Sequence, residues 1–379
     1  MTSELSSLCS YAKGKVSVDT LSKRNYVSTE NMMPNKGGIV DAGALPSAQY
    51  TQQYKKDDIL VSNIRPYFKK IWMADDDGGC SNDVLVFRAD RGCDSTFLYY
   101  ILANDAFFNY ASATSKGTKM PRGDKTAIMQ YKVPCFNYET QLRIGKLLRS
   151  IDDRIAVNKK INDNLQQQLF SLYENMATAS PCLKEYTLSN LCDFQEGYVN
   201  PPQTHPEYFD GEVKWLRAVD INESFIIETS RTLTKAGFES AKKSALLFEP
   251  NTIAISKSGT IGRLGIIADY MCGNRAVINI APHDTNMLAF IYCFLKSKQR
   301  EFPDMAVGSV QKNLYVSLLE PLSVSIPDNE SLTAFNAVGA SILGMIHNNC
   351  VENTDLANLR DTILPKLMSG EIDVSSVLL

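Results

Sequence analysis

Residues 133–176 read VPCFNYETQLRIGKLLRSIDDRIAVNKKINDNLQQQLFSLYENM. After the opening Val-Pro pair, apolar side chains recur in alternating steps of three and four residues, at Ile144, Leu148, Ile151, Ile155, Leu165, Leu169, Leu172 and Met176. This spacing is typical of a coiled coil, in which one face of a helix packs against another helix. The stretch therefore predicts a long helix from Glu139 to about Met176.

The same pattern returns after Ile326-Pro327 and predicts a second long helix from about Glu330 to Met368, with seam positions at Phe335, Val338, Ile342, Met345, Leu356, Leu359 and Ile363. Both seams turn polar near their middle, at Asn158 and Asn162 in the first copy and at Asn349 and Glu352 in the second. An Asn facing a Leu would be buried without a partner, so polar seam positions fix how two helices align. The alternative is two unrelated amphipathic helices on separate cores.

The segments that precede the two helices also repeat. Leu5-Ser6-Ser7-Leu8-Cys9 returns as Leu188-Ser189-Asn190-Leu191-Cys192, and residues 59–65 align with residues 253–259. Several matches in the same order indicate a duplicated unit. At roughly 1.5 Å per residue each long helix would reach about 50 Å, which suits a spacer between two globular heads.

Composition is that of an ordinary globular protein, with 44% hydrophobic and 21% charged residues in 379. This length exceeds what one hydrophobic core usually serves, so two units are expected. There is no apolar run of about 18 residues, and Met1 to Ser10 lacks the pattern of a secretory signal. Nine scattered cysteines without a C-x-x-C pair indicate reduced thiols in a cytoplasmic protein.

Net charge is −3, which counts mildly against a chain that coats nucleic acid with its whole surface. The basic residues nevertheless cluster, and each cluster is either a solvated surface or part of a binding face. In the first half they are Lys55, Lys56, Arg65, Lys69, Lys70, Lys116, Lys119, Arg122 and Lys125; in the second they are Lys235, Lys242, Lys243, Lys257, Arg263 and Arg275.

Both heads are predicted to be mixed α/β units. Strands are expected at residues 58–61, 83–87, 251–255 and 276–280, and helices at 96–111 and 287–296. Trp215-Leu216-Arg217 is expected to begin a core strand, with Arg217 projecting outward. Residues 258–265, SGTIGRLG, match neither the P-loop nor the dinucleotide fingerprint, and they predict a tight turn between strands.

Asn200-Pro201-Pro202-Gln203 is similar to the N-P-P-aromatic signature of amino-group DNA methyltransferases. Here Gln203 replaces the aromatic ring that would stack on a flipped base. No glycine-rich strand-turn-helix for a methyl-donor cofactor precedes it. A polar loop stiffened by two prolines is the better interpretation.

The two-copy layout resembles the specificity subunit of Type I restriction-modification enzymes over almost the whole chain. The resemblance rests on Val133-Pro134 with Gln141 and Ile144, on Ser150-Ile151-Asp152 with Ile155, and on the closing motif Leu359-Arg360, Ile363-Leu364-Pro365-Lys366-Leu367 and Ser369-Gly370-Glu371-Ile372. It implies an α+β fold in which two mixed α/β target recognition domains are joined by two long antiparallel coiled-coil helices, as a pseudo-twofold internal repeat. An antiparallel pairing would bring Asn158 and Asn349 close together.

The expected organisation is target recognition domain 1 at residues 1–136, a central spacer helix at 137–178, target recognition domain 2 at 179–327 and a C-terminal spacer helix at 328–379. The resemblance implies double-stranded DNA as ligand, read as a bipartite, asymmetric site with an unread gap. It also implies two methyltransferase subunits docked around the helices, restriction and translocase subunits in the full complex, and no membrane. All catalytic residues and the S-adenosylmethionine cofactor would belong to the partners, so this chain would carry neither.

Base edges are read by forked donors and acceptors on loops that phosphate contacts hold in register. In the first domain the segments that resemble DNA-facing ones supply Asn63, Arg65, Tyr67, Lys116, Gly117, Thr118, Lys119 and Arg122. In the second domain the expected residues are Arg217, Lys257, Ser258, Thr260, Ser309, Gln311, Lys312 and Asn313. Turn capping for Asn63 and Asn313, and a solvated loop for Lys119 and Arg122, are the alternatives.

Two other functions stay open on the sequence. A coiled-coil adaptor with two protein-binding heads predicts no sequence-selective DNA retention. A self-sufficient DNA adenine methyltransferase using Asn200-Pro201-Pro202 predicts that the isolated chain binds the methyl donor.

Overall fold

The computed structural model describes residues 2–179, 184–309 and 311–375. The chain forms two compact units, unit 1 (residues 1–154 and 356–379) and unit 2 (residues 155–355). Helices α4 (Tyr138–Ala179) and α9 (Asn329–Ser369) each contribute to both units. The two predicted long helices are therefore confirmed, each within three residues of its expected ends.

Unit 1 contains two four-stranded sheets, with strand orders β2-β9-β6-β7 and β3-β5-β8-β4, and β1 pairs with β10. Its strands are β1 (Thr2–Glu4), β2 (Cys9–Tyr11), β3 (Lys15–Ser17), β4 (Tyr26–Val27), β5 (Tyr50–Tyr54), β6 (Ile59–Ser62), β7 (Ile71–Met73), β8 (Gly78–Cys80), β9 (Val84–Ala89) and β10 (Lys132–Pro134). Its short helices are α1 (Ser95–Ala103), α2 (Asp105–Ala113) and α3 (Lys125–Met129).

Unit 2 repeats this scheme with a five-stranded sheet, β12-β20-β17-β18-β14, a four-stranded sheet, β15-β13-β19-β16, and the pair β11-β21. Its strands are β11 (Lys184–Thr187), β12 (Cys192–Glu196), β13 (Phe209–Leu216), β14 (Phe225–Ile226), β15 (Thr232–Leu233), β16 (Leu247–Phe248), β17 (Ile253–Ser256), β18 (Leu264–Ile267), β19 (Met271–Gly273), β20 (Val277–Pro282) and β21 (Ser323–Ile326). Its short helices are α5 (Lys235–Glu239), α6 (Leu288–Lys298), α7 (Phe302–Met305) and α8 (Val316–Leu319).

Each head packs on segments of both long helices. In unit 1, Ile144 and Leu148 of α4 and Leu364 and Leu367 of α9 are buried in the core that contains α1 and α2. In unit 2, the core around α6 takes in Leu169 and Tyr173 of α4 and Phe335, Ile342, Leu343 and Ile346 of α9. Because a fully buried Leu or Ile stabilises the fold by about 1.5–3 kcal/mol, this packing rather than helix propensity holds the helices.

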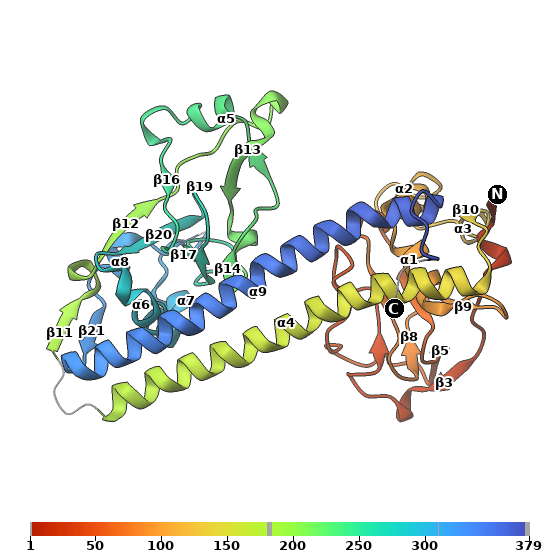
Figure 1. Ribbon diagram of the computed structural model, residues 1–379, viewed down its shortest axis with the longest axis horizontal. Helices are drawn as coiled ribbons and strands as arrows, with labels where there is room; N and C mark the ends of the chain where they lie inside the picture. Colours follow the sequence, from red (N-terminus) through yellow and green to blue (C-terminus); the bar gives the residue numbers. More distant parts are fainter. Residues whose placement is uncertain (1, 180–183, 310, 376–379) are drawn as a thin grey trace. The chain divides into compact units, whose positions relative to one another are not determined.

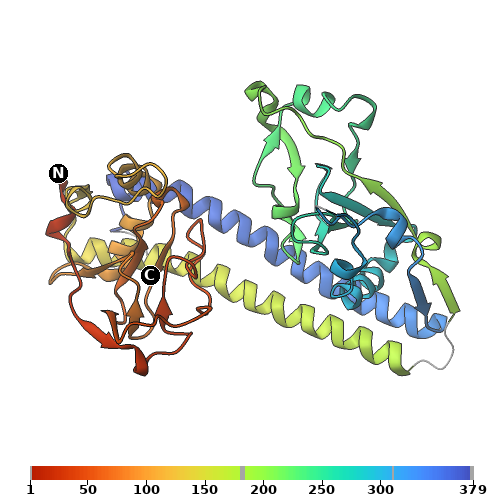
Figure 2. The ribbon, with the colours of Figure 1, turned by 180° about the vertical axis from the view of Figure 1, so that it is seen from behind.

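The helices run antiparallel, as expected. Within unit 2 they lie side by side (Figures 1 and 2), and the polar seam pairs Asn158 with Glu352 and Asn162 with Asn349. The expected proximity of Asn158 and Asn349 is wrong by one helical turn. Asn158 instead donates from Nδ2 to Glu352 Oε2 at 2.8 Å and to Asn353 Oδ1 at 3.1 Å.

Two details differ from expectation. The helix expected at residues 96–111 is two helices, because Asn104 adopts an extended backbone and its Oδ1 caps α2 by accepting the Ala106 N–H. The strand expected to begin at Trp215 ends there instead, since β13 closes at Leu216. A tight turn is confirmed at residues 258–263 between antiparallel strands β17 and β18, whereas Leu264 and Gly265, also expected in the turn, already belong to β18.

Candidate nucleic-acid interface

The two segments singled out in the first domain meet in unit 1. Arg65 N–H donates to Pro121 O at 2.8 Å, and Gly123 N–H donates to Asn63 O at 3.1 Å. The loop 116–122 is closed at its two ends by reciprocal backbone N–H to carbonyl hydrogen bonds of 2.8 and 2.9 Å between Lys116 and Arg122. Residues 63–67, after β6, and the loop 116–122 are therefore joined by backbone hydrogen bonds. Within the first segment Asn63 and Pro66 are buried, Arg65 is half-buried and Tyr67 is exposed.

The backbone after β6 is bent by two non-glycine residues in the left-handed region. Arg65 has φ of 50° and Lys69 has φ of 52°, on either side of a turn at Pro66–Phe68. A side chain with a Cβ disfavours this conformation, so contacts must impose it. The result is that Tyr67 is 52% exposed, with its ring against Phe68 at 4.8 Å between centroids.

The basic side chains of this surface differ in their partners. Lys116 Nζ lies 2.6 Å from Asp124 Oδ2, and Arg122 Nη2 lies 2.9 Å from Asp83 Oδ1. The Lys116 ammonium, together with backbone N–H groups, holds the pKa of Asp124 below its ordinary value. Exposed Lys119 makes no ion pair with any residue that the structure describes. Thr118 is exposed beside it, and Gly117 adopts φ of 98°.

Unit 2 has the same pattern of backbone hydrogen bonds around its corresponding strand and loop, and we call this pattern the backbone frame. Lys257, which follows β17 as Asn63 follows β6, donates its N–H to Ala276 O at 2.7 Å and accepts Leu314 N–H at 2.9 Å. In unit 1 the corresponding bonds join Asn63 to Asp83 O and to Gly123 N–H. The second loop is closed between Val307 and Asn313 by bonds of 3.0 and 2.9 Å, and it has the same length as the first.

The side chains on this shared frame are unlike. Lys257 is half-buried, with Nζ 2.9 Å from Glu196 Oε1 and 4.8 Å from the centroid of the Tyr315 ring. Ser309, Gln311 and Lys312 are exposed. Asn313 is half-buried and donates from Nδ2 to Gln311 O at 3.1 Å, so its amide is used in shaping the loop.

The turn between β17 and β18 carries Ser258 and Thr260. Thr260 is exposed, and its carbonyl accepts a hydrogen bond from buried Ser256 Oγ at 2.5 Å. Ser256 Oγ in turn accepts the Arg263 N–H at 2.8 Å. These two hydrogen bonds of buried Ser256 hold the turn from its inner side, and the Thr260 side chain stays at the surface.

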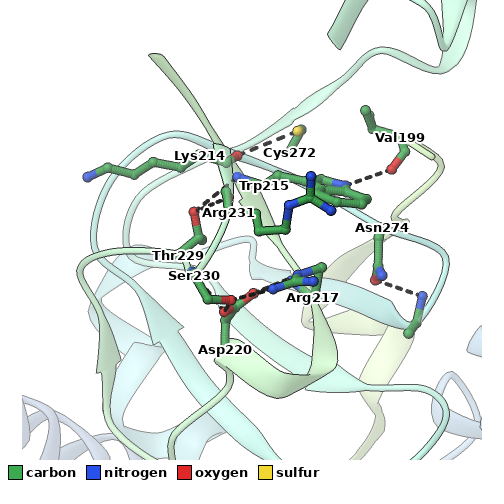
Figure 3. A network of polar contacts seen from close by, with 11 residues as sticks. Val199, Lys214, Trp215, Arg217, Asp220, Thr229, Ser230, Arg231, Cys272 and Asn274 are labelled. Carbon is green, nitrogen blue, oxygen red and sulfur yellow. Dashed lines mark hydrogen bonds and ion pairs between the residues drawn. The ribbon is translucent and has the colours of Figure 1, made fainter. Parts of the chain in front are cut away.

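Arg217 directly follows β13, which belongs to a different sheet from β17 and β18, and lies in the network shown in Figure 3. Its Nη2 donates to Ser230 Oγ at 2.5 Å, and its Cζ lies 5.5 Å from the centroid of the Trp215 ring. The Asp220 side chain, which is 3% exposed, accepts the Arg217 N–H at 2.9 Å. The structure thus uses Arg217 in the internal contacts of unit 2, and its role at DNA stays a prediction.

Two acidic residues of the surface were not singled out in the sequence. Asp83 and Glu196 pair with Arg122 and Lys257, respectively, and both lie far from those residues in the chain. Their proximity depends on the register of β9 against β6 and of β20 against β12 and β17. No local sequence pattern predicts that these acidic residues lie beside their basic partners.

The Asn200-Pro201-Pro202-Gln203 stretch forms a loop after β12. Asn200 and Gln203 are exposed, whereas Pro201 is buried. Gln203 Oε1 accepts a hydrogen bond from Arg231 Nη1 at 3.0 Å, and Arg231 stacks on Phe209 with 4.2 Å from Cζ to the ring centroid. The loop is built as a polar surface segment.

Comparison with known proteins agrees with this duplicated architecture. The family described as "Type I restriction modification DNA specificity domain" matches residues 1–167 and 183–354. The chain therefore belongs to the Type I restriction-modification DNA specificity family.

Named relatives and a solved structure extend the comparison. The chain is 24% identical over 308 residues to the Type I restriction enzyme MjaIX specificity subunit of Methanocaldococcus jannaschii, covering 76% of this chain and 71% of that protein. It is 22% identical to the HindI specificity subunit of Haemophilus influenzae, covering 92% and 94%. The crystal structure of a Type I S subunit from M. genitalium shares the fold, with a TM-score of 0.57, 18% identity and coverage of 97% and 96%.

Among the described residues, no helix is both long enough and apolar enough to cross a membrane. The long helices α4 and α9 carry charged and amide side chains along their length.

Proposed function

We propose that this chain is the DNA-binding specificity subunit of a Type I restriction-modification enzyme. Each recognition domain would read one half of a bipartite, asymmetric site. The observation that carries the proposal is the backbone frame shared by loops 116–122 and 307–313, on which the side chains differ. A shared backbone frame with different side chains suits two domains that bind DNA in the same way and select different bases.

The loops offer chemistry for both kinds of contact. Lys119, which has no ion-pair partner among the described residues, and exposed Lys312 suit phosphates. The ion-paired Lys116 and Arg122 would exchange a carboxylate for a phosphate. Arg65 or Arg122 would suit guanine, while Gln311 or Asn313 would suit adenine. Asn63, Tyr67, Gly117, Thr118, Arg217, Lys257, Ser258, Thr260 and Ser309 complete the proposed interface.

We assign target recognition domain 1 to residues 1–136 and domain 2 to residues 179–327. Residues 137–178 and 328–379 would then be the spacer helices that set the gap and dock two methyltransferase subunits, with restriction and translocase subunits added in the full enzyme. The polar seam supports a spacer role because its paired amides favour one alignment of the helices. S-adenosylmethionine and the catalytic residues would reside on the methyltransferase subunits, and the assembly would work in the cytoplasm.

A loop exchange tests the division of labour. In the complex with its methyltransferase partner, residues 117–121 are replaced by the sequence of residues 308–312, and methylated sites are mapped on genomic DNA. The first half-site should change while the second is retained, and the reciprocal exchange should do the opposite. Methylation of unrelated sites by the wild-type complex, or an address unchanged by both exchanges, would refute the proposal.

The spacer role has its own test. Deleting one heptad from both long helices preserves the seam and should shorten the permitted gap between the half-sites. A deletion in α4 alone breaks the polar pairing and serves as the matched control. A complex that keeps its original gap after the double deletion would contradict the spacer role.

A further inference from the structure

Glu223 is a strained residue at the centre of a polar network in unit 2. It lies before β14 with φ of 63°, in the left-handed region that a non-glycine residue disfavours. Its Oε2 lies 2.6 Å from Lys296 Nζ, and its Oε1 accepts from Gln299 Nε2 at 2.8 Å. Contacts to the carboxylate therefore hold an unfavourable backbone conformation in place.

The backbone carbonyl of Glu223 has its own partners. It accepts a hydrogen bond from Gln166 Nε2 of α4 at 3.0 Å and from Tyr292 Oη of α6 at 3.1 Å. Burial and the Glu223 carboxylate both raise the pKa of Tyr292, which keeps its hydroxyl a donor at neutral pH. One residue thus joins the long helix α4 to α6.

Hydrogen bonds link the Glu223 carboxylate to the turn between β17 and β18. Gln299 Nε2, which binds Glu223, also donates to Gly262 O at 2.9 Å, and Leu264 N–H approaches Glu223 Oε1 at 3.4 Å. Gly262 belongs to the turn that presents Thr260. A continuous chain of hydrogen bonds therefore runs from Gln166 through Glu223 and Gln299 to this turn.

Unit 1 links its head to α4 by a different route. Tyr100 of α1 donates directly to Asp152 Oδ2 of α4 at 2.6 Å, with no intervening loop residue. The link through Glu223 is therefore a feature of the second domain, where a strained loop stands between the helix and the head.

We propose that Glu223 is a positioning residue that fixes the β17–β18 turn relative to helix α4, and thereby the register at which the second domain addresses its half-site. This inference rests on the proposed function, because it takes the turn to face DNA. Loss of the carboxylate would remove the Glu223–Gln299 link between the turn and α4, while the backbone bonds of Glu223 to α4 and α6 and the Ser256 bonds within the turn remain. The complex would then accept half-sites displaced by one base pair.

The test compares methylation by the complete complex on duplexes whose gap is natural, one base pair shorter or one base pair longer. Glu223→Gly removes the carboxylate and suits the positive φ, so the backbone is not further strained. We expect the preference for the natural gap to fall about tenfold, because small misplacements strongly affect reactivity. Glu223→Gln keeps one acceptor oxygen and should restore part of the preference.

Glu228→Gln is the matched control, since Glu228 is exposed and pairs with Lys214 outside this network. It should leave the gap preference unchanged. An equal fall on all three duplexes with Glu223→Gly, or no change, would overturn the positioning role while the proposed function stands. A wild-type complex without bipartite selectivity would instead refute the proposed function.

Discussion

Arg360 of α9 forms an ion pair with Asp152 of α4 in unit 1, with 2.6 Å between Arg360 Nη1 and Asp152 Oδ1. The other oxygen of Asp152 accepts a hydrogen bond from Tyr100 Oη at 2.6 Å. Burial raises the pKa of Tyr100, and the neighbouring carboxylate raises it further, so the hydroxyl stays a donor. A single carboxylate therefore joins both long helices to α1.

Replacing Arg360 by leucine should lower the free energy of unfolding by about 1.5–3 kcal/mol, because a partly buried carboxylate loses a charged hydrogen-bond partner. Urea unfolding monitored by circular dichroism measures the change. Arg149→Ala is the matched control, since the Arg149–Asp153 pair is more than half exposed on both sides. It should cost no more than about 0.5 kcal/mol. Equal losses in the two variants would contradict the role given to Arg360.

The amide pair in the seam should show strong coupling. Asn349 Nδ2 donates to Asn162 Oδ1 at 2.8 Å. Asn162→Leu alone should cost about 1–3 kcal/mol because Asn349 is left without its acceptor, while Asn162→Leu with Asn349→Leu should recover much of that loss. A double-mutant cycle by urea unfolding should give a coupling energy of about 0.5–3 kcal/mol. Additive losses would show that the two amides act independently.

Buried thiols should resist alkylation until alkaline pH. Burial and nearby Asp193 raise the pKa of Cys192 to about 12, and burial raises the pKa of Cys272 to about 12 as well. Because the thiolate is the reactive form, iodoacetamide at neutral pH should modify exposed Cys135 and spare both buried residues, as measured by peptide mass spectrometry. Modification of Cys192 as fast as Cys135 in the folded chain would contradict this.

The same shifts set the sign of a pH effect on stability. The folded state favours the neutral thiol, so the stability contributed by Cys192 and Cys272 is present below the ordinary thiol pKa of 9.0 and is lost as pH rises toward about 12. The urea midpoint should therefore fall across this alkaline window. Cys192→Ala with Cys272→Ala should flatten that fall, and an unchanged slope would refute the assignment.

The long helices could be predicted from the sequence because their pattern is local. Which residues meet across the seam could not, as Asn349 pairs with Asn162 rather than Asn158. That alignment depends on contacts between residues far apart in the chain, such as Tyr173 of α4 with Phe335 of α9. Gln141 is similar: the motif marks it, but only the fold shows that its buried amide accepts the Asp94 N–H and donates to Phe136 O.

For the candidate site, the two loops could be located from their position in each copy and from their glycines and basic residues. Their shared backbone frame could not, because the bonds from Asn63 to Asp83 and from Lys257 to Ala276 depend on strand register. The ion pairs of Arg122 with Asp83 and of Lys257 with Glu196 could not be predicted from the sequence either. Glu223 gave no signal, since its strained φ and its partners exist only in the folded domain.

The glycines of the two loops should differ in tolerance. A Cβ on Gly308 would lie 2.2 Å from Gln311 O, whereas a Cβ on Gly117 would come no closer than 3.5 Å, to Met120 O. Both have positive φ, so Gly117→Ala should cost about 1 kcal/mol, but Gly308→Ala should force loop 307–313 to rearrange. Methylation assays should show lost selectivity for the second half-site in Gly308→Ala. Equal effects on both half-sites in the two variants would contradict the prediction.

Lys119 should act on DNA through charge alone. Lys119 is exposed and, within the described residues, has no carboxylate partner. Lys119→Ala therefore removes a cation without breaking an ion pair inside the protein. Affinity should fall by a similar factor for cognate and unrelated duplexes, and the slope of log K against log salt should shrink by about 1. Fluorescence anisotropy of the complex over a salt series measures both quantities.

Lys132→Ala is the control for that experiment, because Lys132 is exposed but lies 3.0 Å from Glu4 on the β1–β10 pair, outside the proposed interface. Its slope should match that of the wild-type complex. If Lys119→Ala instead leaves the salt slope unchanged and alters only the sequence preference, then Lys119 reads a base edge rather than a phosphate. If it alters neither, loop 116–122 does not contact DNA, because an exposed cation within a Debye length of the phosphates must contribute to counterion release.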